Sequence, residues 1–243
     1  MVQQVAQVAQ ATPTGWVALV ASSAVIGAVI GQVISAISNW LLKIVDAVRE
    51  KEKKGQVVAH VKLEIMDQLE SFANRCANFM YDIEECMEEH YRHVPEAFSN
   101  VQRSIPFKFE PAPKWVELPV PFVAPIKALS REYDDTGDWI NRTGLWADTA
   151  DQYRYELERL AFYGLKALAV ADSIREDIKA GNGGTVQLEA SRSTFTKEIA
   201  AMRERYKATG GEITVIPELE ALFEREMPDL KAATLREKKA DEL

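Results

Sequence analysis

A long uncharged stretch near the N-terminus limits what this chain can fold into more than any other feature. From Trp16 to Leu42 it carries no Asp, Glu, Lys or Arg, and Leu, Ile and Val dominate it. As an α-helix, residues 16–42 would be about 40 Å long, which exceeds the hydrocarbon core of a bilayer at about 30 Å. The sequence therefore predicts a transmembrane helix over residues 16–42, preceded by a short N-terminal tail over residues 1–15.

The charges on either side of this stretch predict its orientation. Residues 1–15 contain no Lys or Arg, so the positively charged start of a cleaved signal peptide is missing. Positive side chains follow the stretch instead, at Lys43, Arg49, Lys51, Lys53 and Lys54. Because positive flanking residues stay on the cytoplasmic side, the sequence predicts a single-pass membrane protein with its N-terminus outside and its C-terminal domain in the cytoplasm.

Small or polar side chains recur at every fourth position within the predicted membrane helix. This stripe consists of Ser23, Gly27, Gly31, Ser35 and Asn39. Such a row lets two helix backbones approach closely, so the predicted partner is another copy of the chain, although Gly and Ser are also simply common in membrane helices. Gln32 is the candidate pore-lining residue, since polar residues inside a membrane often mark a pathway.

A regular apolar pattern predicts a long amphipathic helix over residues 57–94, within a segment that covers residues 43–104. Apolar side chains alternate at spacings of four and three from Ile65 onward, which is typical of a bundle helix or a coiled coil. The same seam continues through Cys86, His90 and His93. Gly55 and the basic run before it allow either a bend or one continuous helix, and the sequence favours neither.

The three residues at the end of this seam are weak candidates for a metal site. Cys86, His90 and His93 lie at i, i+4 and i+7, a spacing at which helical side chains could share a metal ion. A closed site normally needs four ligands, so we expect core packing here and predict no metal and no cofactor. Cys76 is the second of only two cysteines, and both are interpreted as reduced thiols.

Six of the ten prolines lie within residues 105–126. Proline at this density opposes a helix and favours extended chain. Because aromatic and aliphatic residues alternate with the prolines, we expect this connector to lie across the helical domain and to bury some of its side chains. An exposed ligand for another protein and a contact with the bilayer interface are the alternatives.

The C-terminal segment, residues 127–243, is predicted to complete the bundle. A turn-rich stretch over residues 131–146 is followed by helices over residues 148–179 and 185–208, with a glycine cap in the run at 181–184. Residues 213–216 form a strand-like run, and Pro217 can open a last helix. The predicted fold class is all-α: a single N-terminal transmembrane helix followed by an antiparallel helical bundle with a proline-rich extended connector.

Composition and motifs reduce the number of function classes that fit the sequence. A net charge of −8 opposes nucleic-acid binding, because phosphate contacts need clustered Lys and Arg. No nucleophile elbow, phosphate-binding loop or dinucleotide fingerprint occurs, so no catalytic residues and no enzymatic activity are predicted. The sequence favours a self-associating membrane protein whose cytoplasmic bundle organises or gates the assembly, with a pore or permeability effector as the extended hypothesis. The alternative is a non-enzymatic structural subunit of a larger membrane or phage-virion assembly.

Overall fold

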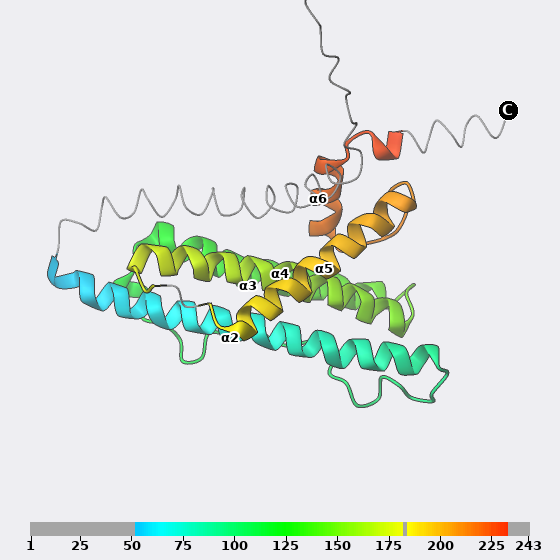
Figure 1. The fold of residues 1–243 in the computed structure, drawn as a ribbon, viewed down its shortest axis with the longest axis horizontal. Helices are drawn as coiled ribbons and strands as arrows, with labels where there is room; N and C mark the ends of the chain where they lie inside the picture. Colours follow the sequence, from blue (N-terminus) through cyan, green and yellow to red (C-terminus); the bar gives the residue numbers. More distant parts are fainter. Residues whose placement is uncertain (1–51, 182–183, 233–243) are drawn as a thin grey trace, which may run out of the picture.

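The computed structural model describes residues 52–181 and 184–232, and these residues form a helical bundle (Figure 1). The long helices are α2 (Glu52–Tyr91), α3 (Val120–Thr143), α4 (Thr149–Ile178) and α5 (Val186–Ala208); α6 (Pro217–Glu226) and the 3-10 turn η1 (Trp115–Glu117) are short. No strand occurs within the described ranges, which confirms the all-helical prediction. None of the helices described is long and apolar enough to cross a bilayer, and the predicted span over residues 16–42 lies outside these ranges.

The long helix α4 lies at the centre of the bundle and packs against α2, α3 and α5. It runs antiparallel to α2, since Lys62 near the start of α2 pairs with Asp177 near the end of α4. By contrast, α2 and α3 run in the same direction: Lys62 lies over the Phe122 ring at the start of α3, and Phe72 further along α2 contacts Tyr133. Residues 92–119 return the chain to the starting end of α2, so the bundle is only partly antiparallel.

The predicted long helix is confirmed, but its buried seam is shorter than the sequence pattern. Gly55 lies inside α2 and does not interrupt it. Side chains from Val58 to Ile83 are buried on one face, whereas Cys86 is half-buried and both His90 and His93 are exposed. Core packing of His90 and His93 was therefore a wrong prediction. The helix ends at Tyr91, and the chain turns away there through a left-handed residue at position 93.

The prediction of extended chain over residues 105–126 is wrong for its last part, because α3 begins at Val120. Pro121 sits in the first turn, where the backbone N–H that proline lacks would have no helical partner. Pro125 lies inside the helix on its exposed side. Phe122 and Ile126 are buried in the core. Burial of this apolar face outweighs the hydrogen bond that Pro125 removes.

The turn-rich stretch predicted at residues 131–146 is helical as far as Thr143. Tyr133, Thr136 and Ile140 bury one face of α3 against the bundle. Gly137, which resembles a helix breaker in the sequence, has a packing role instead. A Cβ at this position would overlap the guanidinium of Arg159 on α4. The glycine therefore makes room for a buried arginine.

The two predicted C-terminal helices are present, with N-caps at Asp148 and Thr185 whose side chains accept hydrogen bonds from backbone N–H groups. The cap at the end of α4 differs from the prediction. Lys179, not a glycine, takes the left-handed conformation that closes the helix, with φ of 54°. The strand-like run at 213–216 forms no strand, but its last two side chains are buried. Pro217 opens α6 as predicted.

Candidate functional site

The structure separates the residues that the sequence singled out. The stripe of Ser23, Gly27, Gly31, Ser35 and Asn39, together with Gln32, lies outside the described residues. The exposed His90 ring lies against the ring of Phe98 at a centroid distance of 5.3 Å. Cys86 lies within α2, whereas His93 follows the helix, which ends at Tyr91. Across residues 52–181 and 184–232, no three His, Cys, Asp or Glu side chains gather where they could hold a metal ion.

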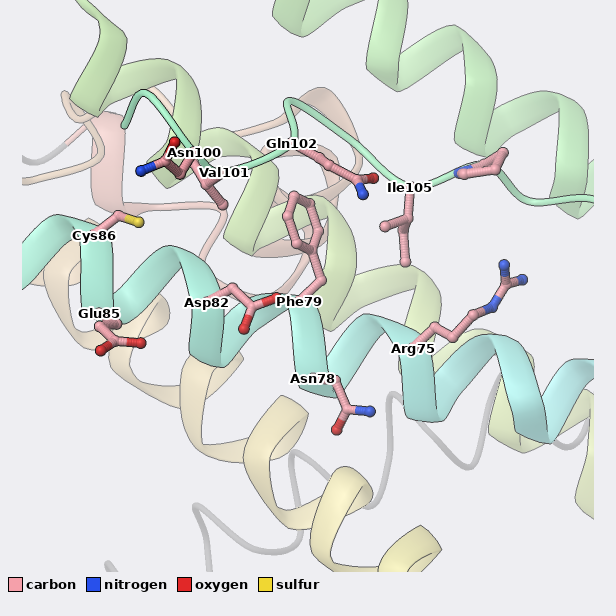
Figure 2. A pocket seen from close by; sticks show the side chains of 11 residues that line it. Arg75, Asn78, Phe79, Asp82, Glu85, Cys86, Asn100, Val101, Gln102 and Ile105 are labelled. Atoms are coloured by element: carbon pink, nitrogen blue, oxygen red, sulfur yellow. The ribbon is translucent and has the colours of Figure 1, made fainter. Parts of the chain in front are cut away.

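A groove of about 500 Å³ lies between α2 and the segment that follows it, and we call it the α2 groove (Figure 2). Phe79 points from α2 toward Val101 and Ile105 of that segment. These three side chains form an apolar floor. The polar side chains around it are Arg75, Asn78, Asp82, Glu85, Asn100 and Gln102.

Three hydroxyl groups hold the outer wall of the α2 groove in place. Tyr133 on α3 donates to the backbone carbonyl of Ile105 at 2.8 Å, and Tyr153 on α4 donates to that of Val101 at 3.2 Å. Ser130 donates to the carbonyl of Phe107 at 3.1 Å. Each bond ties a carbonyl of an irregular segment to a helix of the bundle, so the wall is a fixed part of the fold.

The thiol in the lining of the α2 groove is not activated as a nucleophile. Burial, and then the nearby carboxylates of Glu89, Glu85 and Asp82, raise the pKa of the Cys86 thiol. A thiol with a raised pKa stays protonated and is a poor nucleophile. The mixture of amides, carboxylates and one guanidinium suits hydrogen bonding to an extended polar segment.

A second polar cluster lies inside the bundle, on α3 and α4. Arg159 and Glu156 are almost fully buried and form an ion pair with an N–O distance of 2.8 Å. The Arg159 guanidinium also donates to the backbone carbonyl of Tyr133 at 3.1 Å and lies 4.0 Å from the centre of that ring. Burial raises the pKa of Glu156, and the arginine beside it opposes this. The pair is closed to solvent, so it stabilises one arrangement of the helices and offers no site to a ligand.

A third polar cluster attaches α6 to the bundle. The buried carboxylate of Glu158 on α4 accepts a hydrogen bond from the backbone N–H of Ile216 at 2.8 Å. Two residues further on, Glu218 accepts hydrogen bonds from the hydroxyls of Tyr163 and Thr136. Burial raises the pKa of Glu158 to about 7. The position of α6 therefore depends on carboxylates that sit against the central helices.

Ion pairs between α2 and α4 fasten the starting end of α2. The Lys62 ammonium lies 2.5 Å from the Asp177 carboxylate, and both side chains are less than a tenth exposed. Two turns further along, Glu70 pairs with Arg175. A buried pair is costly to break, because removing one partner leaves the other charge in the interior. The first turns of α2 are thus joined firmly to the end of α4.

The sequence did not reveal the α2 groove. Arg75 and Glu85 lie on the polar face of a predicted amphipathic helix, where charged residues are usually only solvated. Nothing in their spacing shows that residues 100–106 fold back beside them. The one available signal was the mixture of apolar and polar residues between Val101 and Pro106, which a solvated linker would not carry.

The chain matches no protein-family model, no curated protein and no solved structure.

Proposed function

We propose that this protein is a single-pass membrane protein whose copies associate through the stripe of Ser23, Gly27, Gly31, Ser35 and Asn39. Its helical bundle lies in the cytoplasm and organises or gates the assembly. The observation that carries the proposal is the uncharged stretch from Trp16 to Leu42, followed directly by a cluster of positive side chains. The amides, carboxylates and one guanidinium around the α2 groove suit hydrogen bonding to a polar partner, which supports an organising role for the bundle.

The bundle supports this proposal by the way α2 is held. Nine residues separate Leu42, the end of the uncharged stretch, from Glu52, where α2 begins. The buried pair of Lys62 and Asp177 joins the first turns of α2 to the central helix. A displacement that reaches the start of α2 would therefore act on the packed body of the domain. A cytoplasmic partner bound to the bundle could act on the membrane assembly by the same route.

Reporter fusions after residues 10 and 100 test the topology in a bacterial host. A reporter that is active only outside the cytoplasm should work at position 10 and fail at position 100. A reporter that is active only in the cytoplasm should show the reverse. Reporters that place both positions in the cytoplasm, together with extraction of the full chain without detergent, would contradict the proposal.

If the assembly also conducts ions, Gln32 faces the pathway in this proposal. Gln32→Leu should then lower ion leakage from vesicles that contain the full chain, while the oligomeric state changes little. Equal leakage from the variant and the natural chain would remove the pore from the proposal and leave an organising role for the bundle.

A further inference from the structure

Exposed apolar side chains gather where the connector enters α3. Val116 is 93% exposed and Val120 is 77% exposed. Between Pro111 and Ile126 only Lys114 and Glu117 are charged. We call Val116 and Val120 the proximal patch.

The proximal patch lies at the end of the bundle from which the chain leads back to the predicted membrane helix. The start of α3 is beside the first turns of α2, since Lys62 lies 4.9 Å from the centre of the Phe122 ring. Nine residues lie between Leu42 and Glu52, so the chain from one to the other would span about 15 Å as a helix and about 35 Å when extended. This end of the bundle is therefore tethered within reach of the bilayer surface.

The groups around the proximal patch suit a membrane interface. Trp115 is half-buried, and the Lys127 ammonium lies 5.4 Å from the centre of its ring. Tryptophan concentrates at the level of lipid headgroups, and long lysine side chains keep their charge in water while their stems lie on apolar surface. Lys114 adds a second exposed positive charge near the patch, so the two lysines outweigh the exposed carboxylate of Glu117, and anionic headgroups attract the remaining positive charge.

We propose that the proximal patch binds the cytoplasmic surface of the bilayer, with Val116 and Val120 among the headgroups of anionic phospholipids and with Lys114 and Lys127 facing those headgroups. This inference rests on the proposed membrane anchor. It adds that the bundle lies with one end on the bilayer and does not hang freely from its tether. The α2 groove and the loop between α3 and α4 then face the cytoplasm.

The opposite end of α3 supplies a matched control. Leu145, in the loop after α3, is 91% exposed and is therefore as accessible as Val116. The helix between the two positions has 24 residues and is about 36 Å long. A probe at one position cannot report on the surroundings of the other.

The test uses the full chain with Cys86→Ser, because Cys76 is fully buried and does not react with a label. An environment-sensitive fluorophore is attached to Val116→Cys or to Leu145→Cys, and each protein is reconstituted into vesicles of phosphatidylcholine and phosphatidylglycerol. Nitroxide groups on the upper part of the lipid acyl chains serve as the quencher. We expect the probe at position 116 to emit at shorter wavelength and to be quenched severalfold more than the probe at position 145.

Three other results would contradict either the lipid contact or the membrane anchor, and each can be told from the others. If neither probe is quenched while the chain stays in the vesicles after an alkaline wash, the proximal patch does not bind lipid, and the proposed anchor stands. If the probe at position 116 is shifted but not quenched, a protein surface covers the patch, and the inference is wrong. If the alkaline wash removes the chain, the proposed function itself fails.

Discussion

Replacing Arg159 by methionine should be among the most damaging single changes in the bundle. Methionine is apolar and of similar length, so it largely fills the space between α3 and α4. It removes the ion pair with Glu156, the hydrogen bond to the carbonyl of Tyr133 and the contact with the Tyr133 ring. What remains is a carboxylate in the core without a positive partner.

The magnitude follows from that unpaired charge. Breaking a buried pair from one side costs about 3–5 kcal/mol, because the remaining charge has lost both water and partner. For a domain of this size, 1 kcal/mol lowers Tm by about 2–4 °C, so Arg159→Met should lower Tm by about 6–20 °C. The loss should shrink at acid pH. With its pKa raised by burial, Glu156 stays protonated to higher pH than an exposed glutamate, and the destabilisation grows as the pH rises above about 4.3.

Thermal unfolding followed by circular dichroism, on the full chain in detergent, measures this loss. The matched control is Glu156→Leu/Arg159→Met, which removes both charges and should recover most of the stability, since apolar residues often replace a buried pair at little cost. A double variant as unstable as Arg159→Met would refute the reasoning. So would a loss for Arg159→Met that is the same at acid and neutral pH.

Three smaller predictions concern other described residues. Burial raises the pKa of Glu158 to about 7, so its contribution to folding stability is full below about pH 4.3 and is lost as the pH rises through about 7. The urea midpoint of the natural chain should therefore fall over this pH range, and Glu158→Gln should flatten the fall. An unchanged slope in the variant would contradict the prediction. Gly137→Ala should lower the free energy of unfolding by about 1–3 kcal/mol, because the new methyl group meets Arg159. Gly55→Ala meets nothing within 4 Å and should raise the free energy of unfolding by about 0.5–1 kcal/mol. Equal effects of the two variants would refute the packing role of Gly137. Because Cys86 is only half-buried, Cys86→Ala should lower the free energy of unfolding by less than about 1 kcal/mol. The metal content of the purified protein should stay unchanged. Stoichiometric metal that is present in the natural chain and lost in this variant would support the metal site instead.

The elements that the sequence predicted well are those whose pattern is local. The helices α2, α4 and α5 repeat apolar residues with helical spacing, and the caps at Asp148 and Thr185 precede their helices by one residue. The helix α3 was missed because Pro121, Pro125 and Gly137 each oppose a helix when considered alone. Their effect depends on which side of the helix they occupy and on the arginine that packs against Gly137, and neither is a local property of the sequence.

The site was harder to predict than the fold for a related reason. The spacing of Cys86, His90 and His93 continues the helical repeat, but the core ends at Ile83, and only the path of the following chain decides this. The α2 groove exists because hydroxyls of residues far along the chain, such as Tyr153, bind carbonyls of the returning segment. Hydrogen bonds between positions so far apart produce no regular spacing in the sequence from which they could be predicted.

The oligomeric state of the full chain, measured in detergent by light scattering, tests whether copies associate through their membrane helices. In Gly27→Leu/Gly31→Leu, two leucine side chains fill the face along which the helix backbones would meet, while the hydrophobicity needed for insertion is kept. The account predicts a lower oligomeric state for this variant and no change for Leu41→Ala, which lies off the stripe. An unchanged oligomer in the double variant would contradict association through the membrane helices and would move the contact between copies to the bundle.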